Sequence, residues 1–281
     1  MTQKIAVAII HGIGKQVPEF AAEISEALLS HCGETCRADI VIEPIYWAKV
    51  MQDVENELQQ RLQQGGKLGF PRLREFAIDF VADALAYQPA PDDRSAYDGI
   101  HRVFAQAIHL LAEKAGPTTP LCIIAHSLGT VISSNYIYDL QIEPFRPIIS
   151  ANVKDAMTDT PLERGETLTL FYTLGSPIAL WSLRYNNFGK PIEVPAPQLA
   201  HYYPDLKGEW VNFFDKDDVV GFPLKTLNEK YAAVVTEDCQ VDVGNFPTNM
   251  TPAAHMAYWT DQDVIGPIAA GLDRVWQTIN G

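Results

Sequence analysis

One short segment of the sequence combines an apolar run with a serine placed between small residues. It reads I-I-A-H-S-L-G-T at residues 123–130. This pattern predicts a strand that enters a sharp turn, where a strained backbone holds the Ser127 hydroxyl clear of the sheet. In such a turn the strand and the following helix approach closely, so only small residues fit two positions before and two positions after the serine. Here these residues are Ala125 and Gly129. A serine after a strand is also a common helix N-cap, so this segment alone leaves both interpretations open.

A second apolar run lies near the beginning of the chain. Residues 5–10 read I-A-V-A-I-I and lead into His11-Gly12-Ile13-Gly14, where two glycines allow the backbone to turn outward. A phosphate-binding loop would need four residues between its glycines and a serine or threonine after the lysine, but Gln16 follows Lys15. The dinucleotide-binding glycine pattern is also incomplete, because position 17 is valine.

The two segments H-G-I-G and A-H-S-L-G together resemble the signatures of α/β-hydrolases, in particular small bacterial lipases and esterases. Alanine stands where the G-x-S-x-G pattern of that family has its first glycine. The resemblance implies that Ser127 is the nucleophile and that the backbone N–H groups of Ile13 and Leu128 form an oxyanion hole. We expect His126, beside the nucleophile, to be a packing or hydrogen-bonding residue rather than a base, and His11 to brace the oxyanion loop.

A serine nucleophile needs a histidine base, and in this family the base follows the acid along the chain. Only His201 and His255 lie downstream of Ser127. His201 precedes two strand-like segments, whereas His255 follows the last one, residues 232–243, and precedes the C-terminal helix pattern. The sequence therefore favours His255, in an H-x-x-Y-W setting that is similar to the histidine loop of several hydrolase families.

The acid is expected at the end of a strand between the serine and the histidine. The segment W-V-N-F-F at residues 210–214 supplies such a strand, and Asp215, Asp217 and Asp218 follow it. Asp218 is the preferred acid because it directly precedes the apolar pair Val219-Val220, as the acid commonly does in lipase-like hydrolases. Asp217 and Asp215 remain alternatives, since a change of one residue in the loop would exchange their positions.

The order of patterns along the chain predicts one α/β domain over all 281 residues. Hydrophobic residues make up 47% of the sequence, which is enough to bury one large sheet under helices. The expected sheet is mostly parallel, with about six strands. The expected strands are residues 5–10, residues 40–46, a run from Leu121 and runs near Leu168, Val211 and Val234, and the expected helices include 19–29, 131–140 and 263–279.

Residues 50–119, before the nucleophile strand, are too long for a single crossover helix and are predicted to be a helical insertion. Helices are expected over residues 50–64, 73–85 and 96–115, with Gly65-Gly66 as a break. The insertion is either a cap that selects acyl groups or a set of helices that covers the sheet.

Another segment, the aromatic and proline-rich loop 181–203, follows Gly175-Ser176-Pro177. It either lines the acyl pocket or is an ordinary surface loop whose aromatic side chains pack against its prolines. Ser176 precedes a proline and is interpreted as a turn former.

The charge and composition of the chain disfavour several classes of binding partner. The formal net charge is −14 and no basic stripe is present, which disfavours nucleic acid and anionic membranes. No apolar run is long enough to cross a bilayer and nothing resembles a signal peptide, so we expect a cytoplasmic enzyme. Cys32 and Cys36 with His31 could bind a metal, but the sequence contains no second pair of ligands at a suitable spacing to complete such a site. We therefore expect two free thiols at a helix end. The proposed triad requires no cofactor.

These observations predict a serine hydrolase that cleaves a carboxylic ester through Ser127, His255 and Asp218. Its expected substrate is a small ester or acyl compound. Two alternatives stay open. One is a non-catalytic module of the same fold that binds an acyl ligand or a partner protein, since a fold does not fix a function. The other is an acyltransferase that uses the same three residues.

Overall fold

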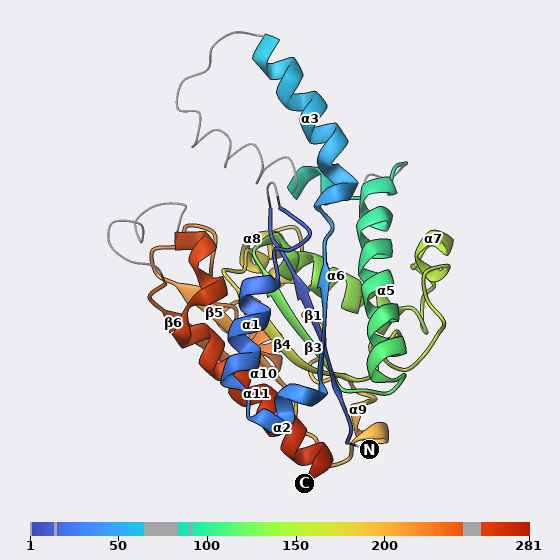
Figure 1. Cartoon of the computed structure of the whole chain (residues 1–281). Helices are drawn as coiled ribbons and strands as arrows, with labels where there is room; N and C mark the ends of the chain where they lie inside the picture. The colour runs from blue at the N-terminus through green and yellow to red at the C-terminus, as the bar shows by residue number, and fades with distance from the viewer. Residues whose placement is uncertain (1, 14–15, 65–83, 90–91, 244–253) are drawn as a thin grey trace.

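The computed structural model contains one six-stranded sheet in which every strand is parallel to its neighbours (Figure 1). The structure describes all residues except 1, 14–15, 65–83, 90–91 and 244–253. The strand order is β2-β1-β3-β4-β5-β6, so β1 and β3 lie side by side near the middle. The strands are β1 (Ile5–Ile10), β2 (Ile40–Ile45), β3 (Leu121–His126), β4 (Leu168–Leu174), β5 (Glu209–Asp215) and β6 (Glu237–Val241).

Helices cover both faces of the sheet (Figure 1). On one face lie α1 (Ala22–His31), α2 (Glu34–Asp39) and α11 (Gln262–Asn280), and on the other lie α5 (Ser95–Ala115) and α6 (Leu128–Ile142). The helix α3 (Ala48–Gln64) projects away from the layers in Figure 1. The shorter helices are α7 (Ala151–Lys154), α8 (Ile178–Ser182), η1 (Asn186–Phe188), α9 (Leu199–Tyr202), α10 (Glu229–Val234) and η3 (Ala254–Thr260).

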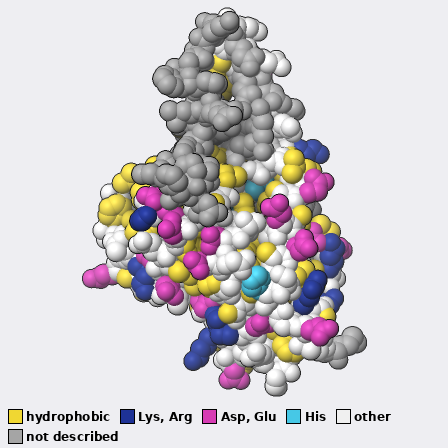
Figure 2. All heavy atoms as spheres, turned by 60° about the vertical axis from the view of Figure 1, so that its left-hand side comes forward, with side chains coloured by type: hydrophobic (Ala, Val, Ile, Leu, Met, Phe, Trp, Pro, Cys, Tyr) yellow, Lys and Arg dark blue, Asp and Glu magenta, His cyan; other side chains and the backbone are white. Residues whose placement is uncertain are grey.

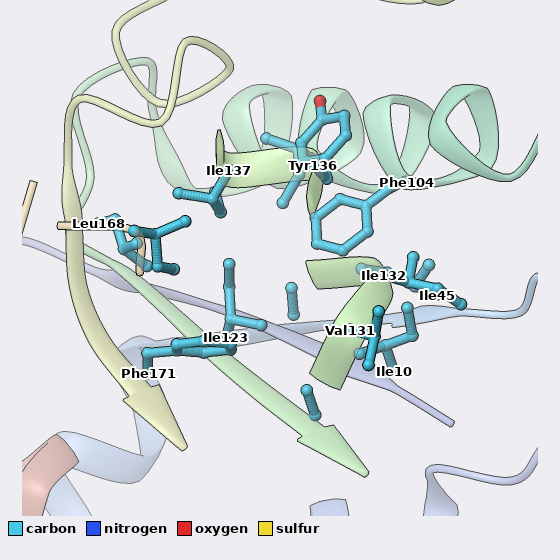
Figure 3. Close-up of a cluster of buried hydrophobic side chains, with 14 of the residues drawn as sticks. Ile10, Ile45, Phe104, Ile123, Val131, Ile132, Tyr136, Ile137, Leu168 and Phe171 are labelled. Atoms are coloured by element: carbon cyan, nitrogen blue, oxygen red, sulfur yellow. The ribbon is translucent and has the colours of Figure 1, made fainter. Parts of the chain in front are cut away.

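The strands β1 and β3 are buried and apolar on both faces because helices cover each face of the sheet. In β1, Ala6, Ala8 and Ile10 pack in the cluster under α5 and α6, while Ile5, Val7 and Ile9 pack in the cluster under α1 and α11. Figure 3 shows the first cluster, in which strand side chains such as Ile10, Ile123 and Phe171 meet helix side chains such as Phe104 and Val131. Burial on both faces explains the unbroken hydrophobic runs in the sequence. It also holds in position the strand ends at which the candidate site lies.

Most predicted elements agree with the structure to within a few residues, but one part of the last predicted strand was wrong. Residues 232–234 belong to helix α10, and the strand β6 begins only at Glu237. The cause lies just upstream, because the Asn228 side chain accepts hydrogen bonds from the N–H groups of Lys230 and Tyr231 and caps the helix at its N-terminus. The predicted helix 73–85 and the Gly65-Gly66 break lie almost entirely outside the described residues.

The surface carries charges of both signs. In Figure 2, acidic and basic side chains are interspersed on the visible face, and no basic stripe gathers there. Among the described helices, none combines the length and the apolar character needed to cross a membrane.

Candidate active site

Ser127 lies at the junction of β3 and α6 in a strained backbone conformation, with φ 52° and ψ −129°. Such a φ is uncommon for a residue with a Cβ and survives only where the surroundings hold it. Here the Ser127 N–H donates to the Leu174 carbonyl at 2.9 Å, and the Thr130 hydroxyl donates to the Ser127 carbonyl at 2.7 Å. Gly129 is required next to it, because a Cβ at that position would lie 2.5 Å from the His11 carbonyl oxygen. The predicted sharp strand-to-helix turn is therefore present.

The glycine turn after β1 presses directly against this serine. A Cβ at Gly12 would lie 2.4 Å from Ser127 Cβ, so only glycine fits there without a shift of the backbone. Ile13 follows this turn, and Leu128 is the first residue of α6. Among the described residues, no acceptor is hydrogen-bonded to the N–H of Ile13 or of Leu128. Two backbone donors therefore remain available beside the serine-bearing turn.

His255 joins Ser127 to Asp218. Its Nε2 lies 2.6 Å from Ser127 Oγ, and its Nδ1 lies 2.8 Å from Asp218 Oδ2. These distances suit an imidazole that donates from Nδ1 to the carboxylate and accepts the serine proton at Nε2. All three side chains are buried. The other histidine candidate, His201, is exposed and lines a hollow with Thr2, Gln3 and Lys4, where the strands begin, so it lies away from Ser127.

Asp218 is held by more than the histidine. Its Oδ1 accepts the Val220 N–H at 3.0 Å, and its Oδ2 accepts the Tyr258 hydroxyl at 2.9 Å. Burial by itself raises the pKa of this carboxyl, but the hydrogen bond and charge of His255 and the bonds from Val220 and Tyr258 lower it more, so the pKa lies below its ordinary value. Asp218 therefore stays ionised at neutral pH and can stabilise a positive charge on His255.

Two glycines leave the space that the Asp218 carboxylate occupies. A Cβ at Gly175 would lie 2.8 Å from Asp218 Oδ2, and a Cβ at Gly221 would lie 2.6 Å from the same oxygen. Gly175 also has a φ of +55°, which an L side chain rarely adopts. The G-S-P turn that the sequence suggested thus forms one wall around the acid. Ser176 within it is buried, and its hydroxyl bonds the Thr130 hydroxyl at 2.8 Å, which agrees with its interpretation as a turn residue.

The other two acid candidates have different surroundings. Asp215 accepts the backbone N–H groups of Asp217 and Val243 at 2.7 and 2.6 Å, so it organises the loop after β5. Asp217 pairs with the neighbouring Lys216 at 2.8 Å. Of the three candidates, the structure brings only Asp218 to His255.

Tyr258 belongs to the H-x-x-Y-W segment of His255, and the sequence alone gives it no role. It is buried three residues after His255 in η3, donates to Asp218 and accepts the Asp215 N–H at 2.8 Å. It therefore ties the end of β5 to the histidine segment. The H-x-x-Y spacing was the available signal, because residues three apart on a helical turn lie on the same side.

His126 supports the segment that carries His255. Its Nε2–H donates to the His255 carbonyl at 2.6 Å, and its ring lies 4.8 Å from the His255 ring and 5.1 Å from the Trp259 ring between centroids. Burial and the adjacent His255 lower the pKa of His126 to about 3, so the ring is neutral at neutral pH. The neutral ring, with its proton on Nε2, acts as a donor that fixes the position of the His255 backbone.

We expect His126→Leu to lower kcat by up to about 100-fold with little change in KM, because a small misplacement of the base weakens proton transfer more than substrate binding. His126→Gln is the matched variant, since its amide can still donate to the His255 carbonyl, and it should recover much of the loss. Steady-state kinetics with an activated ester measures both. Equal losses in the two variants, at equal stability, would contradict a positioning role for the donor.

His11 holds the glycine turn, as the sequence predicted. Its Nδ1–H donates to the Gly12 carbonyl at 2.8 Å, and its Nε2 accepts the Trp47 N–H at 3.2 Å. The Trp47 indole donates to the His11 carbonyl at 2.9 Å and stacks on the imidazole ring. Burial lowers the pKa of His11 to about 4. The ring is therefore neutral and connects the end of β2 to the turn that carries Gly12 and Ile13.

Buried histidines make the fold sensitive to acid. Burial and the charge of Arg94 lower the pKa of His101, a buried residue of α5, to about 3. His11, His101 and His126 therefore all resist protonation in the folded chain. In the unfolded chain their pKa returns to 6.5. The unfolded state then binds more protons, and stability is lost as the pH falls below about 6.5.

The buried Asp139 acts in the opposite direction, because burial raises its pKa to about 6 and the folded state takes up that proton first. The three histidines lower the unfolding free energy on acidification by more than Asp139 raises it. We therefore expect a net loss of about 3 kcal/mol of unfolding free energy between pH 7.5 and 5.5. Urea denaturation at the two pH values measures it. His101→Gln should reduce this loss by roughly 40%, and an unchanged loss would contradict the assignment.

The aromatic loop predicted over residues 181–203 divides between two places. Tyr185 and Phe188 line a cavity of about 260 Å³ beside α6, together with Val131, Ile178 and Trp181. Tyr202 and Tyr203 lie with His201 in the hollow at the opposite end of the strands. Val131 lies one helical turn after Ser127 along α6. Of the two parts of the loop, the part with Tyr185 and Phe188 is therefore the one near the end of the sheet that carries Ser127.

Comparison with protein-family models finds no family that matches the chain, and a search of curated proteins finds no matching relative. The functional interpretation depends on the geometry of the chain itself.

Proposed function

We propose that this chain is a serine hydrolase of the α/β-hydrolase fold that cleaves carboxylic esters. The observation that carries the proposal is the continuous contact from Ser127 Oγ through the His255 ring to Asp218, with distances of 2.6 and 2.8 Å. The chain order serine, aspartate, histidine is that of α/β-hydrolases, and the serine stands at a sharp turn between a strand and a helix as in that fold.

In the proposed reaction, Ser127 Oγ attacks the ester carbonyl carbon while its proton passes to His255 Nε2. Asp218 keeps the imidazole in the required tautomer and stabilises the imidazolium. The tetrahedral oxyanion is placed against the N–H groups of Ile13 and Leu128. Donors of this kind contribute roughly 3 kcal/mol each to transition-state stabilisation.

Collapse of the tetrahedral intermediate breaks the bond to the alcohol oxygen, which receives the proton from His255. An acyl-enzyme on Ser127 remains. His255 then takes a proton from water, the hydroxide attacks the acyl carbon, and Ser127 leaves with its proton restored. An alcohol or amine in place of water would give acyl transfer by the same steps.

The environment favours this chemistry. Ser127 and His255 are shielded from bulk solvent, and interactions between charges and dipoles are stronger where water is excluded. The cavity lined by Val131, Tyr185 and Phe188 begins one helical turn beyond Ser127, and we propose its apolar wall as the acyl pocket.

Labelling by a fluorophosphonate probe tests the proposal, because only a serine hydroxyl polarised by a base and an oxyanion hole reacts quickly. We expect labelling of the folded chain, with the added mass on the peptide that contains Ser127. Hydrolysis of p-nitrophenyl esters of increasing acyl length then defines the substrate class. A folded chain that neither reacts with the probe nor cleaves any ester would instead support a non-catalytic binding module. Turnover that requires an added alcohol or amine would identify an acyltransferase.

A further inference from the structure

Three metal-ligating side chains meet on the face of the sheet opposite α5 and α6. Cys32 ends α1, Cys36 lies in α2, and Asp273 lies in α11. Their two sulfur atoms and one carboxylate oxygen all lie within 4.8 Å of one another. The two cysteines are close in sequence, but the aspartate comes from the far end of the chain. Figure 1 shows α1 beside α11, with α2 next to the C-terminal part of α11.

Neither the fold nor the proposed reaction gives these groups another partner. Both cysteines are buried and form no disulfide. Asp273 accepts a long hydrogen bond of 3.3 Å from the Gly33 N–H and a hydrogen bond from the Cys36 thiol within the group. Among the described residues, no lysine, arginine or histidine lies within ion-pair distance of its carboxylate. The adjacent Arg274 is directed to Glu209 instead. A half-buried carboxylate beside two thiols therefore lacks a cation.

His31 does not belong to this group, although it directly precedes Cys32. Its Nδ1 lies 2.8 Å from the Ala27 carbonyl, and its Nε2 lies 2.7 Å from Gln262 Oε1. Both ring nitrogens are therefore engaged elsewhere. The third ligand is the aspartate of α11, which the spacing of cysteines and histidines in the sequence could not reveal.

We propose that Cys32, Cys36 and Asp273 bind one Zn²⁺ ion, with a water molecule as the fourth ligand. Zinc takes thiolate sulfur at about 2.3 Å and carboxylate oxygen at about 2.0–2.2 Å in a tetrahedron, which sets neighbouring ligand atoms roughly 3.5–3.8 Å apart. The three atoms therefore need to move together by only about 1 Å. Two soft thiolates exclude Mg²⁺ and Ca²⁺, which prefer sites made of oxygen atoms.

Binding forms two Zn–S bonds and one Zn–O bond, and the two thiol protons leave to solvent. The ion would cross-link the α1–α2 corner to α11. Since only Asp261 separates α11 from the η3 segment that carries His255, the cross-link stabilises the helix next to the candidate base. The site itself does not depend on the proposed hydrolase activity.

The test uses the full chain, reduced with a phosphine, stripped with a chelator and then titrated with Zn²⁺ or Co²⁺. We expect one tightly bound Zn²⁺ per chain, a rise of several degrees in melting temperature, and a thiolate-to-cobalt charge-transfer band in the near ultraviolet. Cys32→Ser and Cys36→Ser should abolish the band and the thermal shift. Asp273→Asn should weaken Zn²⁺ binding by at least the roughly 10- to 100-fold that loss of an outer partner of a ligand costs.

Cys239→Ser is the matched control, because Cys239 is a free thiol in β6 outside this group, and it should bind Zn²⁺ like the unaltered chain. The proposal is overturned if the folded, reduced chain binds no Zn²⁺ at a small molar excess. It is also overturned if a Cys32→Ser/Cys36→Ser double variant retains the ion or the cobalt band. Ester cleavage is not the readout, so failure of the zinc site and failure of the hydrolase proposal are distinguishable.

Discussion

Ser127→Ala is expected to reduce kcat for ester cleavage by about 10⁴- to 10⁶-fold, the range seen when the nucleophile of a serine triad is removed. The substitution deletes the hydroxyl oxygen that lies 2.6 Å from His255 Nε2, while it keeps the Cβ against Gly12. Backbone bonds from Ser127 to Leu174 and Thr130 do not involve the hydroxyl, so the turn should persist. The remaining rate would come from the N–H donors and from binding alone.

Initial rates with a p-nitrophenyl ester measure this loss, and far-ultraviolet circular dichroism establishes that the variant is folded. Ser176→Ala is the matched control, since Ser176 is a second buried serine, and its hydroxyl bonds the Thr130 hydroxyl. It should retain most of the activity. If Ser127→Ala kept more than about a hundredth of the rate, the attacking group would be something other than this hydroxyl.

The parts of the fold that were predicted correctly depend on local patterns. The runs at residues 5–10 and 121–126 are buried on both faces, and such strands show as unbroken hydrophobic segments. The serine turn could be predicted because its close contacts demand small residues at fixed positions, as Gly129 against the His11 carbonyl demonstrates. Residues 232–234 were misassigned because the capping bonds of Asn228 outweigh the strand-like composition that follows.

The parts that could not be predicted depend on contacts between distant segments. Asp273 meets Cys32 only because α11 packs on α1, and no spacing in the sequence encodes that meeting. The choice among the three aspartates was open for a related reason. A tight turn, in which the Asp218 N–H bonds the Asp215 carbonyl at 3.2 Å, directs these side chains to different partners within four residues. Only the positions of His255, Val243 and Lys216 show which carboxylate faces the base.

Asp218→Asn is expected to lower kcat by about 10⁴-fold, the effect of the same exchange in a serine-protease triad. The amide keeps the size of the side chain, but it cannot stabilise a protonated His255, and its N–H₂ can force the ring into the wrong tautomer. Ester kinetics across a pH series measures the change. KM should move little, because the carboxylate is buried behind the histidine and does not touch the substrate in the proposed reaction.

The neighbouring aspartates supply the controls that make this expectation specific. Asp217→Asn removes the ion pair with Lys216 and should leave kcat near that of the unaltered chain. Asp215→Asn removes a charged acceptor of two backbone N–H groups, so it should lower the unfolding free energy by about 1–3 kcal/mol while the folded fraction stays active. A large loss of kcat in Asp217→Asn with a mild one in Asp218→Asn would mean that the loop rearranges when substrate binds. The carboxylate that supports His255 would then be Asp217, one of the alternatives that the sequence left open.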